Sequence, residues 1–200
     1  AGAQGGNLVG GSVSIGVSKN KSSSTETTST VQGSTAAAGG TLTVAARGDD
    51  ATDATNGDVR ATAAALSGQN VVLSASKDIS LSAGWDTTHS ESKSASKSAS
   101  VGANVSVGTS GAGVSVSVGG SLSHTSTTSD SATAVDTTVT ATNGVTISAP
   151  GATVLNGAEV SGGNIVLNTG SLSITSPVNT ASYEKESYGG SVGVTIPVWG

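Results

Sequence analysis

The sequence predicts an all-β protein built on a parallel β-helix with coils of about 20 residues. Small hydroxyl side chains dominate the composition, with 36 Ser and 27 Thr among 200 residues. The aliphatic residues, 24 Val, 9 Leu and 6 Ile, mostly alternate with polar residues, which is the pattern of strands. Short strands that begin after Gly or Asn also recur along the chain, as the layers of a solenoid do.

The composition excludes several classes of protein. A net charge of −5 with 10% charged residues is too low for a typical disordered chain. Eight basic residues and a pI near 4.7 exclude the electrostatic footprint of nucleic-acid binding. Without Cys there are no disulfides or thiolate metal sites. With no Phe and two Trp the core is expected to be thin and elongated, and the start at Ala1 without a leader suggests a fragment of a longer exported chain.

Internal repeats are the most informative feature. The strands at 71–74 and 78–81 recur at 165–168 and 171–174, about 94 residues later. The tail at 85–88, Trp-Asp-Thr-Thr, corresponds to Val-Asn-Thr-Ala at 178–181. The chain therefore holds two copies of a unit roughly one hundred residues long.

A shorter period lies within each unit. Val145 and Ile165 are about 20 residues apart, the length of one coil, whereas Leu42 and Val71 are about 29 apart. The excess matches an inserted acidic loop at 49–57. The aliphatic stack inside the coils is predicted to contain Leu42, Val44, Leu66, Val71, Leu73, Ile79, Leu81, Val145, Ile147, Leu155, Val160, Ile165, Leu167, Leu172 and Ile174.

The segment from Ser92 to His124 differs, because Val, Ala or Lys occupies almost every second position between Ser and Gly. Val101–Val107 are odd and Val114–Leu122 even, so a hairpin puts them on one face when paired residue numbers add to an odd value. A two-residue turn at Ser110-Gly111, with positive φ at the Gly, satisfies this. The pairs would then be Val107 with Val114, Val105 with Val116, and Ala103 with Val118.

This register also predicts the polar neighbours in the stem. Lys97 would face His124, and Glu91 would lie opposite Asp130, where the like charges should fray or bulge the ladder. Half-hairpins of the same type stand at 13–17 and 192–198. Their partners are either missing or are neighbouring strands of this chain.

The predicted organisation follows from these segments. It comprises a partial hairpin and Ser/Thr return at 1–32, coils at 33–84, an inserted hairpin at 85–135, a second set of coils at 136–182, and the first arm of a following hairpin at 183–200.

The candidate sites are weak, and we assign no catalytic, cofactor-binding or metal-binding residue. Asp49, Asp50, Asp53, Asn56 and Asp58 offer oxygen ligands for calcium, but their spacing fits neither an EF-hand nor a calcium β-roll, so a solvated loop is the preferred interpretation. His89 and His124 without a carboxylate cluster make a poor metal site. A polysaccharide-cleaving β-helix would need carboxylates along one groove. The sequence has no repeated carboxylate pair on one face, and Arg47 and Arg60 flank the acidic loop, so an enzyme is not expected.

The Val face of the hairpin is the strongest candidate surface. It could lie on the coils, pair with the next hairpin, or enter a membrane as strands. Membrane strands need about 9–11 residues and usually carry aromatic girdles. Here the apolar stretch is about seven residues per arm, and Trp85, Tyr183, Tyr188 and Trp199 lie outside it. We therefore expect packing against the chain's own coils or neighbouring hairpins.

The Gly/Asn-led coils, the Trp85–Thr88 tail, the Ser/Lys run at 90–100, the Val/Gly hairpin and the Ser/Thr return at 125–142 occur here in a fixed order. This order resembles the haemagglutinin repeats of filamentous-haemagglutinin-type exoproteins, which include the contact-dependent growth inhibition exoproteins. The resemblance implies a right-handed β-helix with extra hairpins. It also implies export through an outer-membrane two-partner transporter, and a place on the bacterial surface or in the secreted fraction.

From the resemblance we expect a non-enzymatic, cofactor-free adhesive segment that extends a rod and presents hairpins to another cell. The alternative is a repeat of a growth-inhibition exoprotein that associates with the target outer membrane during toxin delivery. The expected partners are the transporter, the target-cell surface or outer membrane, and, through end-to-end self-association, further copies. Nucleic acid is not expected.

Overall fold

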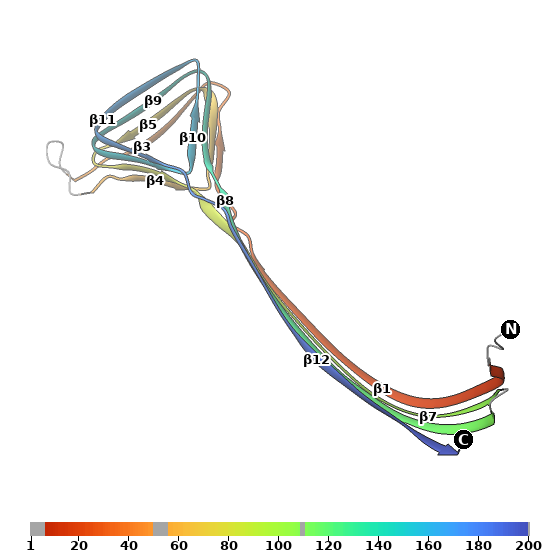
Figure 1. Ribbon diagram of the computed structural model, residues 1–200. Coiled ribbons are helices and arrows are strands. Elements are labelled where there is room, and N and C mark those ends of the chain that lie inside the picture. Colours follow the sequence, from red (N-terminus) through yellow and green to blue (C-terminus); the bar gives the residue numbers. More distant parts are fainter. Residues whose placement is uncertain (1–6, 50–55, 109–110, 200) are drawn as a thin grey trace, which may run out of the picture. The chain divides into compact units, whose positions relative to one another are not determined.

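A computed structural model describes residues 7–49, 56–108 and 111–199 (Figure 1). The described residues form twelve strands. None of them forms a helix long and apolar enough to cross a membrane. The strands are β1 (Asn7–Ser29), β2 (Thr35–Ala37), β3 (Thr41–Ala46), β4 (Val59–Thr62), β5 (Ala65–Ala75), β6 (Ile79–Ser82), β7 (Gly84–Gly108), β8 (Gly111–Val135), β9 (Thr137–Asn156), β10 (Ala158–Ser161), β11 (Asn164–Thr175) and β12 (Thr180–Trp199).

The chain divides into two compact units, and the all-β class is confirmed in both. The curled unit contains residues 27–89 and 130–182, and the long-strand unit contains residues 1–26, 90–129 and 183–200. The curled unit holds a curled parallel sheet. The long-strand unit holds long antiparallel strands in the order β1-β7-β8-β12. Each unit is described by itself below.

Parallel pairing in the curled unit forms three ladders, which Figure 1 shows as the sides of a triangular stack. Each ladder places equivalent residues of four successive layers side by side. The first ladder aligns Ala36, Leu66, Val139 and Val160. The second aligns Leu42, Val71, Val145 and Ile165. The third aligns Val59, Ile79, Thr153 and Leu172.

The ladder registers confirm the predicted short period. Val145 pairs with Ile165 and Val59 with Ile79, each about 20 residues along the chain. Leu42 pairs with Val71 across a longer interval, because the acidic loop lies between them. Strands β5 and β9 are adjacent although β7 and β8 intervene in the sequence. The parallel register of the stack thus continues across both insertions.

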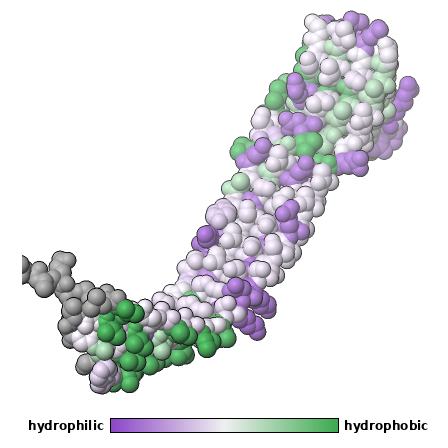
Figure 2. Space-filling view, turned by 90° about the vertical axis from the view of Figure 1, so that its right-hand side faces the viewer, coloured by the Kyte–Doolittle hydropathy of each residue, from purple (hydrophilic) through white to green (hydrophobic). Residues whose placement is uncertain are grey.

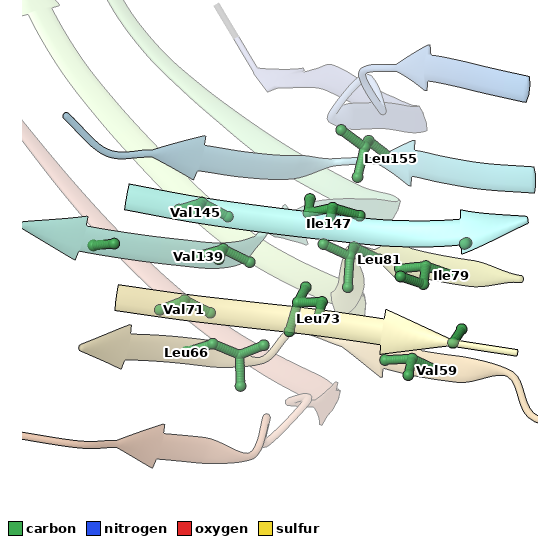
Figure 3. Close-up of a cluster of buried hydrophobic side chains, with 13 residues drawn as sticks. Val59, Leu66, Val71, Leu73, Ile79, Leu81, Val139, Val145, Ile147 and Leu155 are labelled. Atoms are coloured by element: carbon green, nitrogen blue, oxygen red, sulfur yellow. The ribbon is translucent and has the colours of Figure 1, made fainter. Parts of the chain in front are cut away.

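The core of the curled unit is a narrow stack of inward-facing aliphatic side chains (Figure 3). Alternation along each short strand points every second residue inward, and parallel pairing sets like residues on top of one another. Burying one such Val, Leu or Ile contributes roughly 1.5–3 kcal/mol. Eight of the predicted core residues are buried: Leu66, Val71, Leu73, Ile79, Leu81, Val145, Ile147 and Leu155.

The prediction of burial is wrong for three of the core residues. Ile165, Leu172 and Ile174 are 44%, 48% and 66% exposed. All three lie on β11, which pairs with β9 on one side and with no other described strand on the other. A layer needs a neighbour on each side to cover its inward residues, so the last layer stays open. For the same reason the predicted residues Leu42, Val44, Val160 and Leu167 are only partly buried.

Candidate interaction surface

The long-strand unit contains one four-stranded sheet made mainly of alternating Val and Ser/Gly. β-Branched residues fit a pleated surface well. The many Val residues of this segment therefore favour extended strands. Side chains alternate between the two faces, so the sheet has one aliphatic face and one hydroxyl-rich face. Strands β1 and β12 join β7 and β8 in this sheet. Of the two alternatives left open for the half-hairpins, pairing with a neighbouring strand is therefore the correct one.

The pairing of β7 with β8 differs from the predicted register by two residues. The hydroxyls of Ser96 and Ser123 are 2.7 Å apart, as are those of Ser98 and Ser121, whereas the predicted register puts Ser98 opposite Ser123. A shift by two residues preserves which face each side chain occupies, so the common Val face is confirmed. Gly111 has the predicted positive φ, at +132°. The shifted register puts it opposite Gly108, however, so the two-residue turn predicted at Ser110-Gly111 is wrong in position.

The two-residue shift changes the polar pairs of the stem. The predicted repulsion between Glu91 and Asp130 is wrong, because Asp130 instead lies 2.5 Å from Nδ1 of His89. Glu91 is paired with Lys93 at 2.5 Å, within the same strand. The shift thus replaces two facing carboxylates with favourable pairs, and the strands run through this region without a break.

His124 also has a different neighbour from the one predicted. Its ring packs against Tyr188 of β12, with ring centroids 5.0 Å apart and planes tilted by 34°. The same register of β8 and β12 brings the hydroxyls of Thr125 and Ser187 within 3.1 Å. His124 therefore belongs to a cross-strand aromatic pair at the border of the Val face and does not face Lys97.

The aliphatic side chains of the long-strand unit are exposed. Figure 2 shows hydrophobic residues gathered in a continuous patch on the long strands. Its exposed members are 45–76% accessible. Soluble monomers rarely expose contiguous apolar patches larger than a few hundred Å². The exposed members of this patch are Val9, Val13, Ile15, Val17, Val101, Val105, Val107, Val118, Leu122, Val192, Val194, Ile196 and Val198.

Lysines follow the aliphatic residues on the same face. Lys19 and Lys21 continue the odd-numbered positions of Val13 and Val17 along β1, and Lys97 continues those of β7. Strand alternation therefore places their side chains on the Val face, just beyond the patch. Such a surface offers apolar contact beside cationic groups that reach into solvent.

The structure describes only part of the acidic loop that offered candidate calcium ligands. Asp50 and Asp53 lie outside the described residues. The Asn56 side-chain oxygen accepts the Asp49 backbone N–H at 3.0 Å, and Asp58 accepts a hydrogen bond from Arg60 at 2.8 Å. This hydrogen bond lowers the pKa of Asp58 and raises that of Arg60. Among the described residues, no three His, Asp or Glu side chains are grouped to hold a metal ion, and Arg47 remains beside the loop.

The pair of His89 and Asp130 lies in a cleft of the curled unit, about 390 Å³ in volume. Hydroxyl side chains of Thr27, Ser29 and Thr87 share its lining. Among the described residues, Asp130 is the hydrogen-bond partner found for the His89 ring. Activation of a nucleophile would need a hydroxyl hydrogen-bonded to the other ring nitrogen. As it stands, the pair joins two antiparallel strands where they enter the curled unit.

Two equivalent side chains that the sequence analysis did not single out accept backbone hydrogen bonds within the curled unit. Asp86 accepts the backbone N–H of Val31 at 2.7 Å. Asn179 accepts the backbone N–H of Ala134 at 2.8 Å. The internal repeat aligns Asp86 with Asn179, so a polar acceptor at the same point of both copies was the signal that could have identified them.

Known proteins have sequences similar to most of this chain. The family described as "Hemagglutinin repeat" matches residues 15–190. The protein named "tRNA nuclease CdiA" from Escherichia coli (strain NC101) is 32% identical over 181 residues. The match covers 90% of this chain and 6% of that protein, so this chain spans only a small part of its relative. No solved structure matches the chain.

Proposed function

The chain belongs to the haemagglutinin repeat family of secreted two-partner exoproteins, and we propose that it is a non-enzymatic adhesive segment of such a protein. The curled unit extends a rod, and the long strands present an interaction surface to another cell. The observation that carries this proposal is the aliphatic face, which the chain builds from four strands and leaves 45–76% exposed. Contiguous exposed apolar surface of this size marks sites of contact.

We further propose that the curled parallel sheet is a right-handed β-helix. Three parallel ladders with a spacing of about 20 residues per layer support a helical path. The handedness follows from the family resemblance and from the preference of parallel crossover connections. The repeat boundaries at 1–32, 33–84, 85–135, 136–182 and 183–200 belong to this proposal, as does export through an outer-membrane transporter.

Adhesion of coated beads to bacterial cells tests the adhesive role. Wild-type chain on the beads should bind cells, and a variant with Val105, Val107, Val114 and Val116 changed to Ser should lose most of the binding. A matched variant with Ser96, Ser98, Ser121 and Ser123 changed to Ala alters the opposite face and should bind normally. Equal binding by the two variants, or no binding by the wild type, would contradict the proposal.

A second candidate function is association with the outer membrane of a target cell during toxin delivery. The lysines beside the aliphatic patch favour it, because lipid surfaces combine acyl chains with anionic headgroups. The CdiA relative is named as a tRNA nuclease, which fits a role in toxin delivery. In this function the Val face contacts lipid and Lys19, Lys21 and Lys97 contact headgroup phosphates.

Co-flotation with bacterial outer-membrane vesicles separates the two candidates. Flotation of the wild type that is lost in the four-Val variant and reduced by Lys19→Gln with Lys97→Gln supports membrane association. Bead adhesion without flotation supports a protein or glycan contact instead. Flotation that survives all of these substitutions would remove the Val face from the membrane function.

A further inference from the structure

Two lysines from neighbouring strands of the long-strand unit lie opposite each other. A methyl carbon placed on Gly16 of β1 would lie 3.4 Å from Cβ of Ser100 in β7, which sets the antiparallel register of these strands. Counting three residues along each strand from this pair places Lys19 of β1 directly opposite Lys97 of β7. Both lysines lie on the aliphatic face, where the Cβ atoms of directly opposite residues are about 4.5–5.5 Å apart.

No acidic side chain forms an ion pair with Lys97 or Lys19 among the described residues. Lys97 is on the inner strand β7, so the strands on both sides of it are described. On its own face its neighbours across the strands include Lys19, Lys21, Leu122 and Gly120. Like charges directly opposite each other destabilise a sheet, so an anion bound between the two ammonium groups would be stabilised by both.

An apolar groove on the same face begins at Lys97. Its volume is about 560 Å³, and its lining includes Lys97, Leu122, Val192, Gly120 and Gly190. A methyl carbon on Gly190 would meet nothing within 4 Å, and one on Gly120 would meet only a backbone oxygen at 3.4 Å. Neither glycine has a positive φ. Neither packing nor backbone conformation therefore requires Gly at these positions, and their effect is to leave the face hollow beside Leu122 and Val192.

We propose that this groove binds one acyl chain of an anionic membrane lipid, with the headgroup phosphate held between Lys19 and Lys97. The chain would cover Leu122 and Val192, which are 45% and 72% exposed. The groove volume lies within the roughly 300–1,000 Å³ of small-molecule sites. Charge complementarity selects the occupant, because a neutral lipid or an apolar peptide would leave the two facing lysines unpaired. The proposal rests on the membrane association proposed above and narrows it from a lipid surface to a site for one lipid molecule.

Dodecyl phosphate, used below its critical micelle concentration, is a soluble probe with one chain and one phosphate. Isothermal titration calorimetry with the whole chain should show saturable binding of one molecule. Inorganic phosphate and dodecyl maltoside each carry only one half of this ligand, and each should bind at least about tenfold more weakly. Equal binding of dodecyl maltoside would overturn the proposal, because the lysines would then have no part in recognition.

Two variants test the halves of the site separately. Lys97→Gln removes one of the facing cations, and Gly120→Leu fills the groove at a position with room for a side chain. Each should weaken binding of dodecyl phosphate by about tenfold or more, whereas Lys97→Arg should retain most of the affinity. Lys185→Gln, which removes a lysine from the opposite face of the same unit, is the matched control and should bind like the wild type.

Thermal unfolding separates lost binding from lost folding. Lys97→Gln relieves the repulsion between facing lysines, so its melting temperature should not fall below that of the wild type. Wild-type affinity in both Lys97→Gln and Gly120→Leu would overturn the site. Vesicle flotation by a chain that does not bind dodecyl phosphate would remove this site and leave membrane association in place. Binding of dodecyl phosphate that both variants lose, without flotation of the wild type, would support the site and contradict the membrane function.

Discussion

The curled unit and the long-strand unit use the same alternating aliphatic pattern with opposite outcomes. In the curled unit Val71 and Val145 are 0% and 1% exposed, whereas Val105 and Val118 in the long-strand unit are 46% and 53% exposed. The curled sheet turns one face inward on itself, so its inward residues cover one another. The long-strand sheet does not close, so its aliphatic face stays exposed. Alternation therefore selects a face, and only the closure of the sheet determines whether that face becomes core.

The largest expected contrast between the units comes from a charge on each apolar face. Leu73→Asp places a carboxylate among fully buried side chains and should cost at least about 4 kcal/mol of unfolding free energy. Val105→Asp puts the same charge on an exposed face and should change stability by no more than about 0.5 kcal/mol. Thermal and denaturant unfolding followed by circular dichroism measures both. Similar losses in the two variants would mean that both faces are buried.

A smaller contrast lies within the curled unit, between a middle layer and the last one. Ile147→Ala removes buried methyl groups and should cost about 2–5 kcal/mol. Ile165→Ala, at a 44% exposed position, should cost less than half as much. The comparison uses chain at a concentration where sedimentation detects only monomer. A cost at Ile165 equal to that at Ile147 would show that something covers the last layer.

The hydrogen bond from Val31 to Asp86 within the curled unit gives an intermediate effect. Asp86→Ala removes the acceptor of the Val31 N–H and should cost about 1–2 kcal/mol. Asp86→Asn should retain most of the stability, because Asn179 performs the same role for Ala134 with an amide oxygen. Denaturant unfolding measures both variants. If Asn were as destabilising as Ala, the hydrogen bond would not be the source of the effect.

The smallest expected effect is a pH dependence at the acidic loop. The hydrogen bond from Arg60 lowers the pKa of Asp58 below its ordinary value of 3.8, so the pair stabilises the fold above that pH. The contribution is lost as pH falls through the lowered pKa, and solvent screening keeps it small. Arg60→Gln should flatten this part of the curve of melting temperature against pH, while the nearby Arg47→Gln should leave it intact. A curve unchanged by Arg60→Gln would exclude the pair as its cause.

The sequence predicted the curled unit well, because Gly- and Asn-led strands with a fixed period leave little freedom in the register. The predicted exposure failed at Ile165, Leu172 and Ile174, because a strand in the last layer carries the same residues as a covered one. The hairpin register failed by two residues for a different reason. A period-two pattern is unchanged by an even shift, so the Val residues set only the face. The polar pair of His89 and Asp130 distinguishes the observed register from the predicted one.

Chemical accessibility of a thiol tests the central comparison most directly. Val71→Cys and Val105→Cys are conservative replacements at equivalent-looking alternating positions, and the chain contains no other Cys. Labelling with a small thiol reagent, at a concentration where the chain is monomeric, should modify Val105→Cys within about tenfold of the rate of the unfolded chain. Val71→Cys should react at least about a hundredfold more slowly. Comparable protection of both thiols would contradict the exposed aliphatic face, and rapid labelling of both would contradict the closed core.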